Sequence, residues 1–292
     1  MRTNRYEDDM NTANPTQSFH LVASDLDGTL LAPNHQLSDY TKQTLQQLHQ
    51  QGYTFIFATG RHHVDVAGIR EQAGIPAYMI TSNGARVHDQ HDRLMYSCDV
   101  PADLVQAIID VVKHDPQIRI HLYRNDEWLI SQEDEQLRQF HNDSGFSYAM
   151  FDVDNAPTDG IAKVFCTHLA QNHEHLVAYE EQLNVLFGER LNIAFSTPWC
   201  LEAMAAEVSK GHALQAVAHS LDLTLAHCLA FGDGMNDVEM LSMAGKGLVM
   251  GTSHERVKQA LPHNEVIGSS ADDAVAHYLA EHLLQVQTEK RA

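Results

Sequence analysis

Cysteine is scarce in this sequence and forms no recognisable pattern. The four cysteines, Cys98, Cys166, Cys200 and Cys228, include no pair in the C-x-x-C spacing that zinc sites and redox motifs use. The chain also lacks an apolar run of about 18 residues, which a membrane-spanning helix needs, and an apolar signal-peptide segment near its start. These absences argue against a cysteine-held metal and a helical membrane span. We therefore expect a cytoplasmic protein with reduced cysteines.

Positive charge is also in short supply. Lys and Arg number 19 against 39 Asp and Glu, which gives a formal net charge of −20. Without a basic cluster, general attraction to nucleic acid or to anionic membranes is disfavoured, so we expect neither as a partner. The oligomeric state is left open. Residues 1–18 are polar and are expected to form a disordered extension, within which Met10 is a second candidate start.

Two aspartates stand one residue apart after the apolar run 19–23, which has the composition of a strand buried in a parallel sheet. Side chains at positions i and i+2 of an extended segment point the same way, so Asp25 and Asp27 can address one substrate. A divalent cation with oxygen ligands, such as Mg²⁺, relieves their mutual repulsion. The pattern predicts phosphoryl transfer, with one carboxylate as nucleophile and the other as acid and base. A glycine-capped Asx turn is the structural alternative.

Further polar groups follow the apolar runs 53–58 and 228–232. Thr59 and Gly60 offer a hydroxyl and backbone N–H groups at a strand's carboxyl end, where open α/β sheets bind ligands. Asp233 is placed to complete a metal site, and Asp237 comes four residues later. That spacing brings both acids to one side if the segment is helical. For Thr59 and Gly60 the alternative is a simple strand-to-helix turn. For Asp233 and Asp237 it is a solvated loop.

Lys210 opens the amphipathic stretch 210–221. The start of a helix carries partial positive charge, so it is an unfavourable place for a structural cation, and a bound phosphate would resolve the conflict. A solvated surface lysine is the alternative interpretation. Four such segments in one order favour a shared function.

In their order and spacing these segments resemble the four motifs of the haloacid dehalogenase superfamily, in particular its Cof-type branch, which has a large cap between the second and third motifs. The resemblance implies an α/β fold: a Rossmannoid core with a parallel sheet and an inserted α+β cap domain. We expect the core at residues 19–85 and 196–292 and the cap at 86–195. Ser24 departs from the large apolar residue that is usual before the nucleophile, which predicts looser packing there.

The resemblance also implies roles for individual residues. It implies a Mg²⁺-dependent phosphatase with Asp25 as nucleophile, Asp27 as acid and base, and Lys210 as a further catalytic residue. The implied metal ligands are Asp25, Asp27 through its main-chain carbonyl, and Asp233, with Asp237 in support. The residues implied to hold the phosphate are Thr59, Gly60, Lys210 and Asn236. Mn²⁺ takes similar oxygen ligands and stays an alternative to Mg²⁺.

For the substrate, the resemblance implies 4-amino-2-methyl-5-hydroxymethylpyrimidine diphosphate (HMP-PP), hydrolysed to the monophosphate, with side activity on other small phosphate esters. A broad phosphatase for sugar phosphates, pyridoxal phosphate or flavin mononucleotide is the nearest alternative. A phosphomutase and a phosphate-accepting sensor are others. Because the core motifs meet only the phosphate, specificity is expected to lie in the cap.

Two further groups of residues have competing interpretations. Residues 88–92, His-Asp-Gln-His-Asp, have metal-ligating side chains but lie between two strand-like segments, which favours a solvated hairpin turn. Tyr123, Trp128 and Trp199 offer rings that would stack on a pyrimidine or flavin, but aromatic residues in strands also serve as packing residues.

Overall fold

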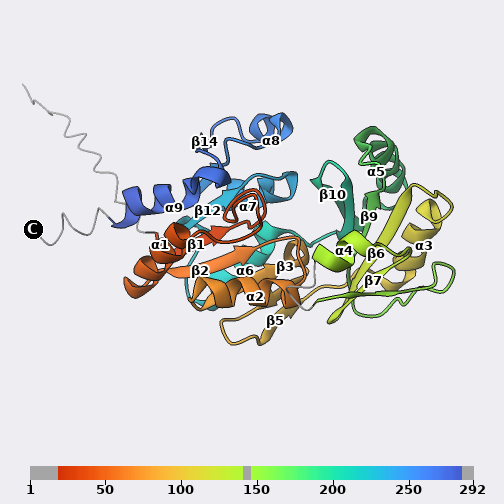
Figure 1. Ribbon diagram of the computed structural model, residues 1–292, viewed down its shortest axis with the longest axis horizontal. Helices are drawn as coiled ribbons and strands as arrows, with labels where there is room; N and C mark the ends of the chain where they lie inside the picture. Colours follow the sequence, from red (N-terminus) through yellow and green to blue (C-terminus); the bar gives the residue numbers. More distant parts are fainter. Residues whose placement is uncertain (1–18, 141–145, 285–292) are drawn as a thin grey trace, which may run out of the picture.

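The computed structural model describes residues 19–140 and 146–284, which form two sheets (Figure 1). The expected extension at residues 1–18 lies outside the described residues. The larger sheet, called the core sheet, has the order β14-β13-β12-β1-β2-β3-β4-β5. Its strands are β1 (Leu21–Ser24), β2 (Thr54–Ala58), β3 (Ala77–Thr81), β4 (Arg86–His88), β5 (Leu94–Ser97), β12 (Cys228–Gly232), β13 (Lys246–Val249) and β14 (Glu265–Val266).

The core sheet is parallel from β14 to β3, and only β4 and β5 pair antiparallel. Helices cover both faces, which explains the near-continuous apolar strands. The helices on one face are α1 (Asp39–Gln50), α2 (His63–Ala73) and α9 (Ala274–Leu279). Those on the other are α6 (Lys210–Ser220), α7 (Val238–Met243) and α8 (Glu255–Ala260). The predicted α/β class with a parallel sheet is confirmed.

The second sheet, called the cap sheet, has the order β10-β11-β9-β6-β7-β8. Its strands are β6 (Ile118–Arg124), β7 (Glu127–Ile130), β8 (Tyr148–Met150), β9 (Ile161–His168), β10 (Leu191–Thr197) and β11 (Cys200–Ala205). One face packs against α3 (Ala102–Val112) and α5 (His173–Phe187), while α4 (Glu135–Phe140) lies towards the core sheet (Figure 1). The cap sheet and its helices thus stand beside the core sheet.

Strand pairing shifts the domain boundaries that we expected from the sequence. β4 and β5 pair onto β3, so the segment 86–97 extends the core sheet and does not begin the cap. At the other end β11 pairs with β9 and β10, so the chain stays in the cap sheet beyond residue 196, as far as Ala205. The second difference arises because β11 pairs with β9, about 33 residues earlier, and the local pattern gives no sign of that partner. In the first, the hairpin 86–97 pairs back onto the neighbouring β3, where the change of pattern after residue 85 predicted a new domain. The division into a core and an inserted domain itself stays a prediction.

Candidate active site

Asp25 lies at the carboxyl end of β1, at the centre of the parallel sheet, and is only 6% exposed. The turn that follows depends on Gly28, whose φ is +80°. A Cβ at Gly28 would lie 2.5 Å from Oδ2 of Asp233 in the loop after β12. Glycine therefore permits both the left-handed backbone and the close approach of two acidic loops. Ser24, where looser packing was expected, is 3% exposed, and the expectation about its packing stays a prediction.

Lys210 is the first residue of α6 and is completely buried. Its Nζ donates hydrogen bonds of 2.7 Å to Oδ1 of Asp25 and to Oδ1 of Asp237. Burial alone would lower the pKa of the lysine, but the charges of Asp237 and Asp25 hold that pKa above its ordinary value. Two carboxylates therefore stabilise the cation at this helix start, where the sequence analysis assigned that task to a bound phosphate.

Asp25, Asp233 and Asp237 form one acidic group, with carboxylate oxygens within 4.8 Å of one another. Burial, opposed by Lys210, raises the pKa of Asp25 well above its usual value. Burial and the neighbouring Asp237 raise the pKa of Asp233 to about 6. Three carboxylates share a single ammonium here, and an oxygen-only donor set suits a hard divalent cation. The group therefore fits a metal ion.

Asp237 also shapes the loop that carries Asp233. Its Oδ2 accepts hydrogen bonds from the backbone N–H groups of Asp233 at 3.0 Å and of Gly234 at 2.8 Å. Asp233 in turn accepts a hydrogen bond of 2.9 Å from the hydroxyl of Thr29. The four-residue spacing thus brings both acids to one side, as predicted, through a 3₁₀ turn at Met235–Asp237.

The Asp27 carboxylate turns towards two residues that the sequence analysis did not select. Arg61 donates two hydrogen bonds of 2.6 Å to its two oxygens, and His35 Nδ1 lies 2.8 Å from Oδ1. Burial favours the neutral acid, but the bonds from Arg61 and His35 outweigh it and lower the pKa of Asp27. Asp27 is therefore held as a carboxylate. Arg61 directly follows Thr59 and Gly60, and that position was the signal available in the sequence.

The expected phosphate-holding residues gather beside these acids. Thr59 is buried, and its Oγ1 accepts a hydrogen bond of 3.1 Å from the backbone N–H of Arg61. Nδ2 of Asn236 donates to Oδ1 of Asn83 at 3.0 Å. A Cβ on Gly60 would stand 3.1 Å from the same Asn83 oxygen. Asn83 thus bonds Asn236 and leaves little room for a side chain at position 60.

The cap sheet presents a polar and aromatic face to this edge of the core sheet. Alternate residues of β6 and β9 share the face, and the register pairs Arg119 with Thr167, His121 with Phe165, and Tyr123 with Lys163. The intervening apolar residues pack against α3 and α5. The alternation in residues 118–124 was visible in the sequence, but which face meets the core was not.

Lys163 on β9 connects the cap sheet to the loop that holds Thr59 and Gly60. Its Nζ donates to the carbonyl of Gly60 at 2.7 Å and to Oε1 of Glu202 at 2.5 Å, and both side chains are buried. The Glu202 carboxylate also accepts a hydrogen bond from the amide of Asn83. A buried network therefore runs from β9 and β11 to two loops of the core.

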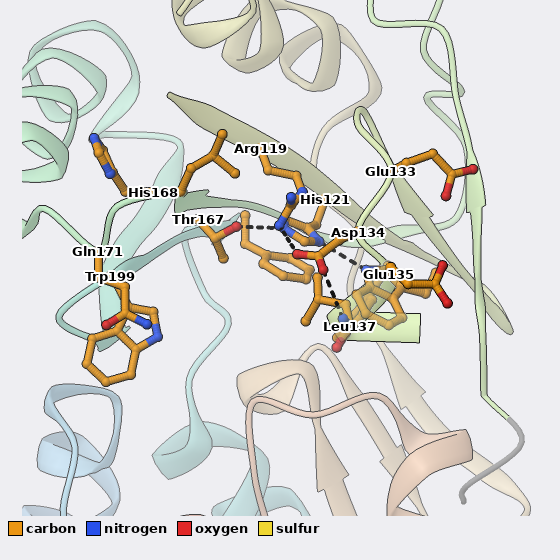
Figure 2. A pocket seen from close by; sticks show the side chains of 14 residues that line it. Arg119, His121, Glu133, Asp134, Glu135, Leu137, Thr167, His168, Gln171 and Trp199 are labelled. Carbon is orange, nitrogen blue, oxygen red and sulfur yellow. Dashed lines mark hydrogen bonds and ion pairs between the residues drawn. The ribbon is translucent and has the colours of Figure 1, made fainter. Parts of the chain in front are cut away.

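A cavity of about 400 Å³ lies between the two sheets. Six of the eight predicted site residues line it, namely Asp25, Asp27, Thr59, Gly60, Asp233 and Asn236. Lys210 and Asp237 are buried and contact this group. A second cavity of about 770 Å³ continues over the cap sheet and shares Tyr123, Phe165, Thr167 and Trp199 with the first (Figure 2). The cap sheet thus forms one wall of the space in front of Asp25.

Of the two groups with competing interpretations, the aromatic one shares a cavity with the acids. Tyr123 and Trp199 line both cavities, and Trp128 is a buried wall of the larger one. Their stacking on a substrate stays a prediction. Residues 88–92 join β4 to β5, which confirms the hairpin turn, although His88 and Asp89 are buried where a solvated turn was expected. Within 19–140 and 146–284, the only cluster able to hold a metal is that of Asp25, Asp233 and Asp237.

A parallel sheet with helices on both faces gathers buried carboxylates and a lysine at its carboxyl edge, under the polar face of a second sheet, which is the arrangement of an α/β-class enzyme with an acidic centre. The chain belongs to the haloacid dehalogenase-like hydrolase family, whose model matches residues 22–279. The predicted membership is confirmed. None of the described helices is both long and apolar enough to span a membrane.

Comparison with known proteins agrees with this membership. The chain is 41% identical over 261 residues to a protein of Yersinia pestis (strain Pestoides F) named HMP-PP phosphatase, covering 89% of this chain and 94% of the relative. A haloacid dehalogenase-like hydrolase of B. subtilis has a similar structure, with a TM-score of 0.79, 26% identity, and coverage of 91% and 100%. One from Bacteroides thetaiotaomicron has a TM-score of 0.77 at 21% identity, with coverage of 90% and 99%, and shares the fold.

Proposed function

We propose that this protein is a phosphatase that hydrolyses HMP-PP to the monophosphate and inorganic phosphate. The observation that carries the proposal is the placement of Asp25, at the end of β1 with Lys210 Nζ 2.7 Å away and a cavity of about 400 Å³ in front of it. The choice of substrate is supported by the name of the Yersinia pestis relative, at 41% identity.

Asp25, Asp233 and Asp237 supply an oxygen donor set for Mg²⁺, with the main-chain carbonyl of Asp27 as a further candidate ligand. When bound, a divalent cation acts as a Lewis acid on a phosphoryl oxygen and reduces the repulsion between the acids. The crowding of three carboxylates around one ammonium supports this assignment. Oxygen ligands also suit Mn²⁺, so the choice between the two ions is part of the test.

In the first step, a carboxylate oxygen of Asp25 attacks phosphorus and forms an aspartyl phosphate, while the bond from phosphorus to the leaving oxygen breaks. Asp27 gives its proton to that departing oxygen. In the second step, the Asp27 carboxylate takes a proton from water, and the water oxygen attacks phosphorus. Inorganic phosphate leaves, and Asp25 and protonated Asp27 are restored. Arg61 and His35 have to release Asp27 before it can be protonated.

The remaining residues position the phosphate and neutralise charge. Thr59, Gly60 and Asn236 line the cavity and are assigned to the phosphoryl oxygens. Lys210 offsets the charge on the nucleophile. For the phosphate monoesters among the alternative substrates, hydrolysis demands an acceleration of up to about 10²¹, or roughly 28 kcal/mol of barrier, which no single group supplies. Several prearranged charges acting together are therefore required.

The test is phosphate release by the purified protein with Mg²⁺ or Mn²⁺, on HMP-PP beside flavin mononucleotide, pyridoxal phosphate and glucose 6-phosphate. Asp25→Asn is the inactive variant, and Asp154→Asn, at an acid whose side chain is 74% exposed, is the matched control. A kcat/KM for HMP-PP at least about tenfold above the other esters supports the proposal, because tenfold corresponds to about 1.4 kcal/mol of specific recognition. Similar values across the panel indicate a broad phosphatase.

Two other results would point to the remaining hypotheses. Interconversion of phosphate isomers with little free phosphate would indicate a mutase. If the wild-type protein released no more phosphate than Asp25→Asn from every ester, the phosphatase proposal would be rejected. The phosphate-accepting sensor would then become the leading hypothesis.

A further inference from the structure

Two hydrogen bonds join Trp128, His121 and Thr167 in the wall of the larger cavity, and the donor and the acceptor of each can be assigned. The indole Nε1 of Trp128 donates a hydrogen bond of 3.2 Å to Nδ1 of His121. Nε2 of His121 lies 2.9 Å from the hydroxyl oxygen of Thr167, a contact drawn as a dashed line in Figure 2. An indole nitrogen can only donate, so Nδ1 of His121 has to be the acceptor.

His121 is buried and neutral. It is 1% exposed, and its ring stacks on Phe165 with centroids 4.4 Å apart and planes inclined by 9°. Burial, together with the nearby charges of Arg119 and Lys163, lowers its pKa well below the usual value. A neutral imidazole that accepts at Nδ1 carries its proton on Nε2. His121 therefore donates to the Thr167 oxygen.

The hydroxyl hydrogen of Thr167 is then left for another acceptor. A threonine hydroxyl has one hydrogen, and the oxygen already accepts from His121. Within residues 19–140 and 146–284, no acceptor takes that hydrogen. Thr167 lines both the cavity in front of Asp25 and the larger cavity above it. The hydrogen is therefore available to a ligand at the junction of the two.

The walls at this junction are aromatic. Tyr123, Phe165 and Trp199 line both cavities together with Thr167. Aromatic faces offer a flat, apolar surface, which favours a planar ring over a polyhydroxylated sugar. A donor left without an acceptor on ligand binding weakens binding, so the favoured ring carries an acceptor atom at this point.

We propose that Thr167 is a specificity-determining residue whose hydroxyl donates a hydrogen bond to an acceptor atom, such as a ring nitrogen, of a flat heteroaromatic leaving group. The inference rests on the proposed phosphatase function, since the ring is taken to be the part of the substrate that leaves with the non-transferred phosphate. It goes further by assigning one residue to recognition of the ring and by giving the donor and acceptor of that contact. Trp128 and His121 act through Thr167 and are positioning residues.

The test compares HMP-PP with benzyl diphosphate, which places a benzene ring on the same methylene diphosphate and lacks ring nitrogens. Thr167→Val removes the hydroxyl with little change of shape, and Thr167→Ser keeps it. The wild-type protein is expected to prefer HMP-PP by at least about tenfold in kcat/KM, because a site built around a hydrogen bond rejects the analogue that cannot make it.

For Thr167→Val we expect a loss of about three- to tenfold on HMP-PP, the value of one neutral hydrogen bond, and less than about twofold on benzyl diphosphate. Thr167→Ser should retain the wild-type ratio of the two substrates. Because both substrates are measured on one preparation, partial unfolding of a variant changes both rates equally and leaves their ratio intact.

Equal losses on the two substrates, or no loss on HMP-PP, would overturn the inference while leaving the phosphatase in place. So would a wild-type protein that hydrolyses benzyl diphosphate as well as HMP-PP. If the wild-type protein released no more phosphate than Asp25→Asn from either diphosphate, the proposed function would fail, and the inference with it.

Discussion

Arg61 donates hydrogen bonds of 2.6 Å to both carboxylate oxygens of Asp27, from Nε to Oδ2 and from a terminal nitrogen to Oδ1. The fork geometry fixes the plane of the carboxylate as well as its charge. Asp27, the proposed acid and base, is therefore held in a fixed orientation and as a carboxylate. Its protonation therefore depends on how strongly Arg61 holds it.

We predict that Arg61→Gln raises the pKa of Asp27 by about one unit or more, because a guanidinium at this distance lowers a carboxyl pKa by about 1–3 units. The measurement is a ¹³C NMR titration of aspartate carboxyl carbons, with the Asp27 signal assigned by its loss in Asp27→Asn. Arg190→Gln is the matched control, since it breaks a two-bond pair with Asp103 on the exposed surface. An Asp27 titration unchanged by Arg61→Gln would show that burial and His35 decide the charge.

A second prediction concerns the acidic group of Asp25, Asp233 and Asp237. Addition of Mg²⁺ to metal-free protein at ten times the dissociation constant should stabilise the fold by about 1.4 kcal/mol. For a protein of this size the melting temperature then rises by about 3 °C, measurable by calorimetry. Asp233→Asn should remove most of this rise and Asp154→Asn none of it. A full rise in Asp233→Asn would place the metal elsewhere.

The parts of the site that could be predicted are those in which a polar residue directly follows an apolar strand. Asp25, Thr59 and Asp233 each follow an apolar strand, and parallel strands deliver their carboxyl ends to one edge of the sheet. The α/β class, the site edge and the hairpin at residues 88–92 follow from such local signals.

The parts that could not be predicted depend on contacts between distant segments. Asp27 and Arg61 are 34 residues apart, and Lys163 reaches Gly60 across 103 residues. Nothing in the sequence near β11 indicates that it pairs with β9. Nothing in the sequence distinguishes Thr167 from other strand residues. Only the register of β6 and β9 shows that it lies opposite Arg119 and contacts His121.

A third prediction is that His62 makes stability depend on pH. Its Nε2–H donates to the carbonyl of Asn125 at 2.8 Å, and its Nδ1 accepts from the N–H of Val64 at 3.2 Å, an arrangement that needs the neutral ring. Burial, reinforced by His63, lowers the pKa of His62 to about 3. The unfolded chain, with a pKa of about 6.5, binds the proton more tightly, so the stabilisation is complete above about pH 6.5 and is lost as pH falls towards 3.

Between pH 7 and pH 5 this linkage is worth about 2 kcal/mol. Urea unfolding of the wild-type protein should show that loss in excess of any seen for His62→Gln, whose amide keeps one donor and one acceptor without titrating. His254→Gln is the control, because His254 is an exposed histidine that caps α8 through the N–H of Arg256. Equal losses in wild-type protein and His62→Gln would mean that the folded state accommodates the charged ring.

The last prediction concerns the buried pair of Lys163 and Glu202, whose charged atoms lie 2.5 Å apart with both side chains 3% exposed. Lys163→Met should destabilise the protein by about 3–5 kcal/mol, because it leaves a carboxylate buried without its partner. The double variant Lys163→Met/Glu202→Gln removes that charge and should recover most of the loss in urea unfolding. Arg190→Gln, at an exposed pair, should cost at most about 1 kcal/mol.

The same variants distinguish an effect on stability from an effect on the position of the loop that holds Thr59 and Gly60. In the double variant the charge is gone, but the hydrogen bond from Lys163 to the Gly60 carbonyl is still missing. If that bond holds the loop in place, kcat/KM stays low although stability has returned. Recovery of both quantities together would show that the pair only balances its own charges, and that the loop is positioned by Asn83 and the backbone bonds of Thr59.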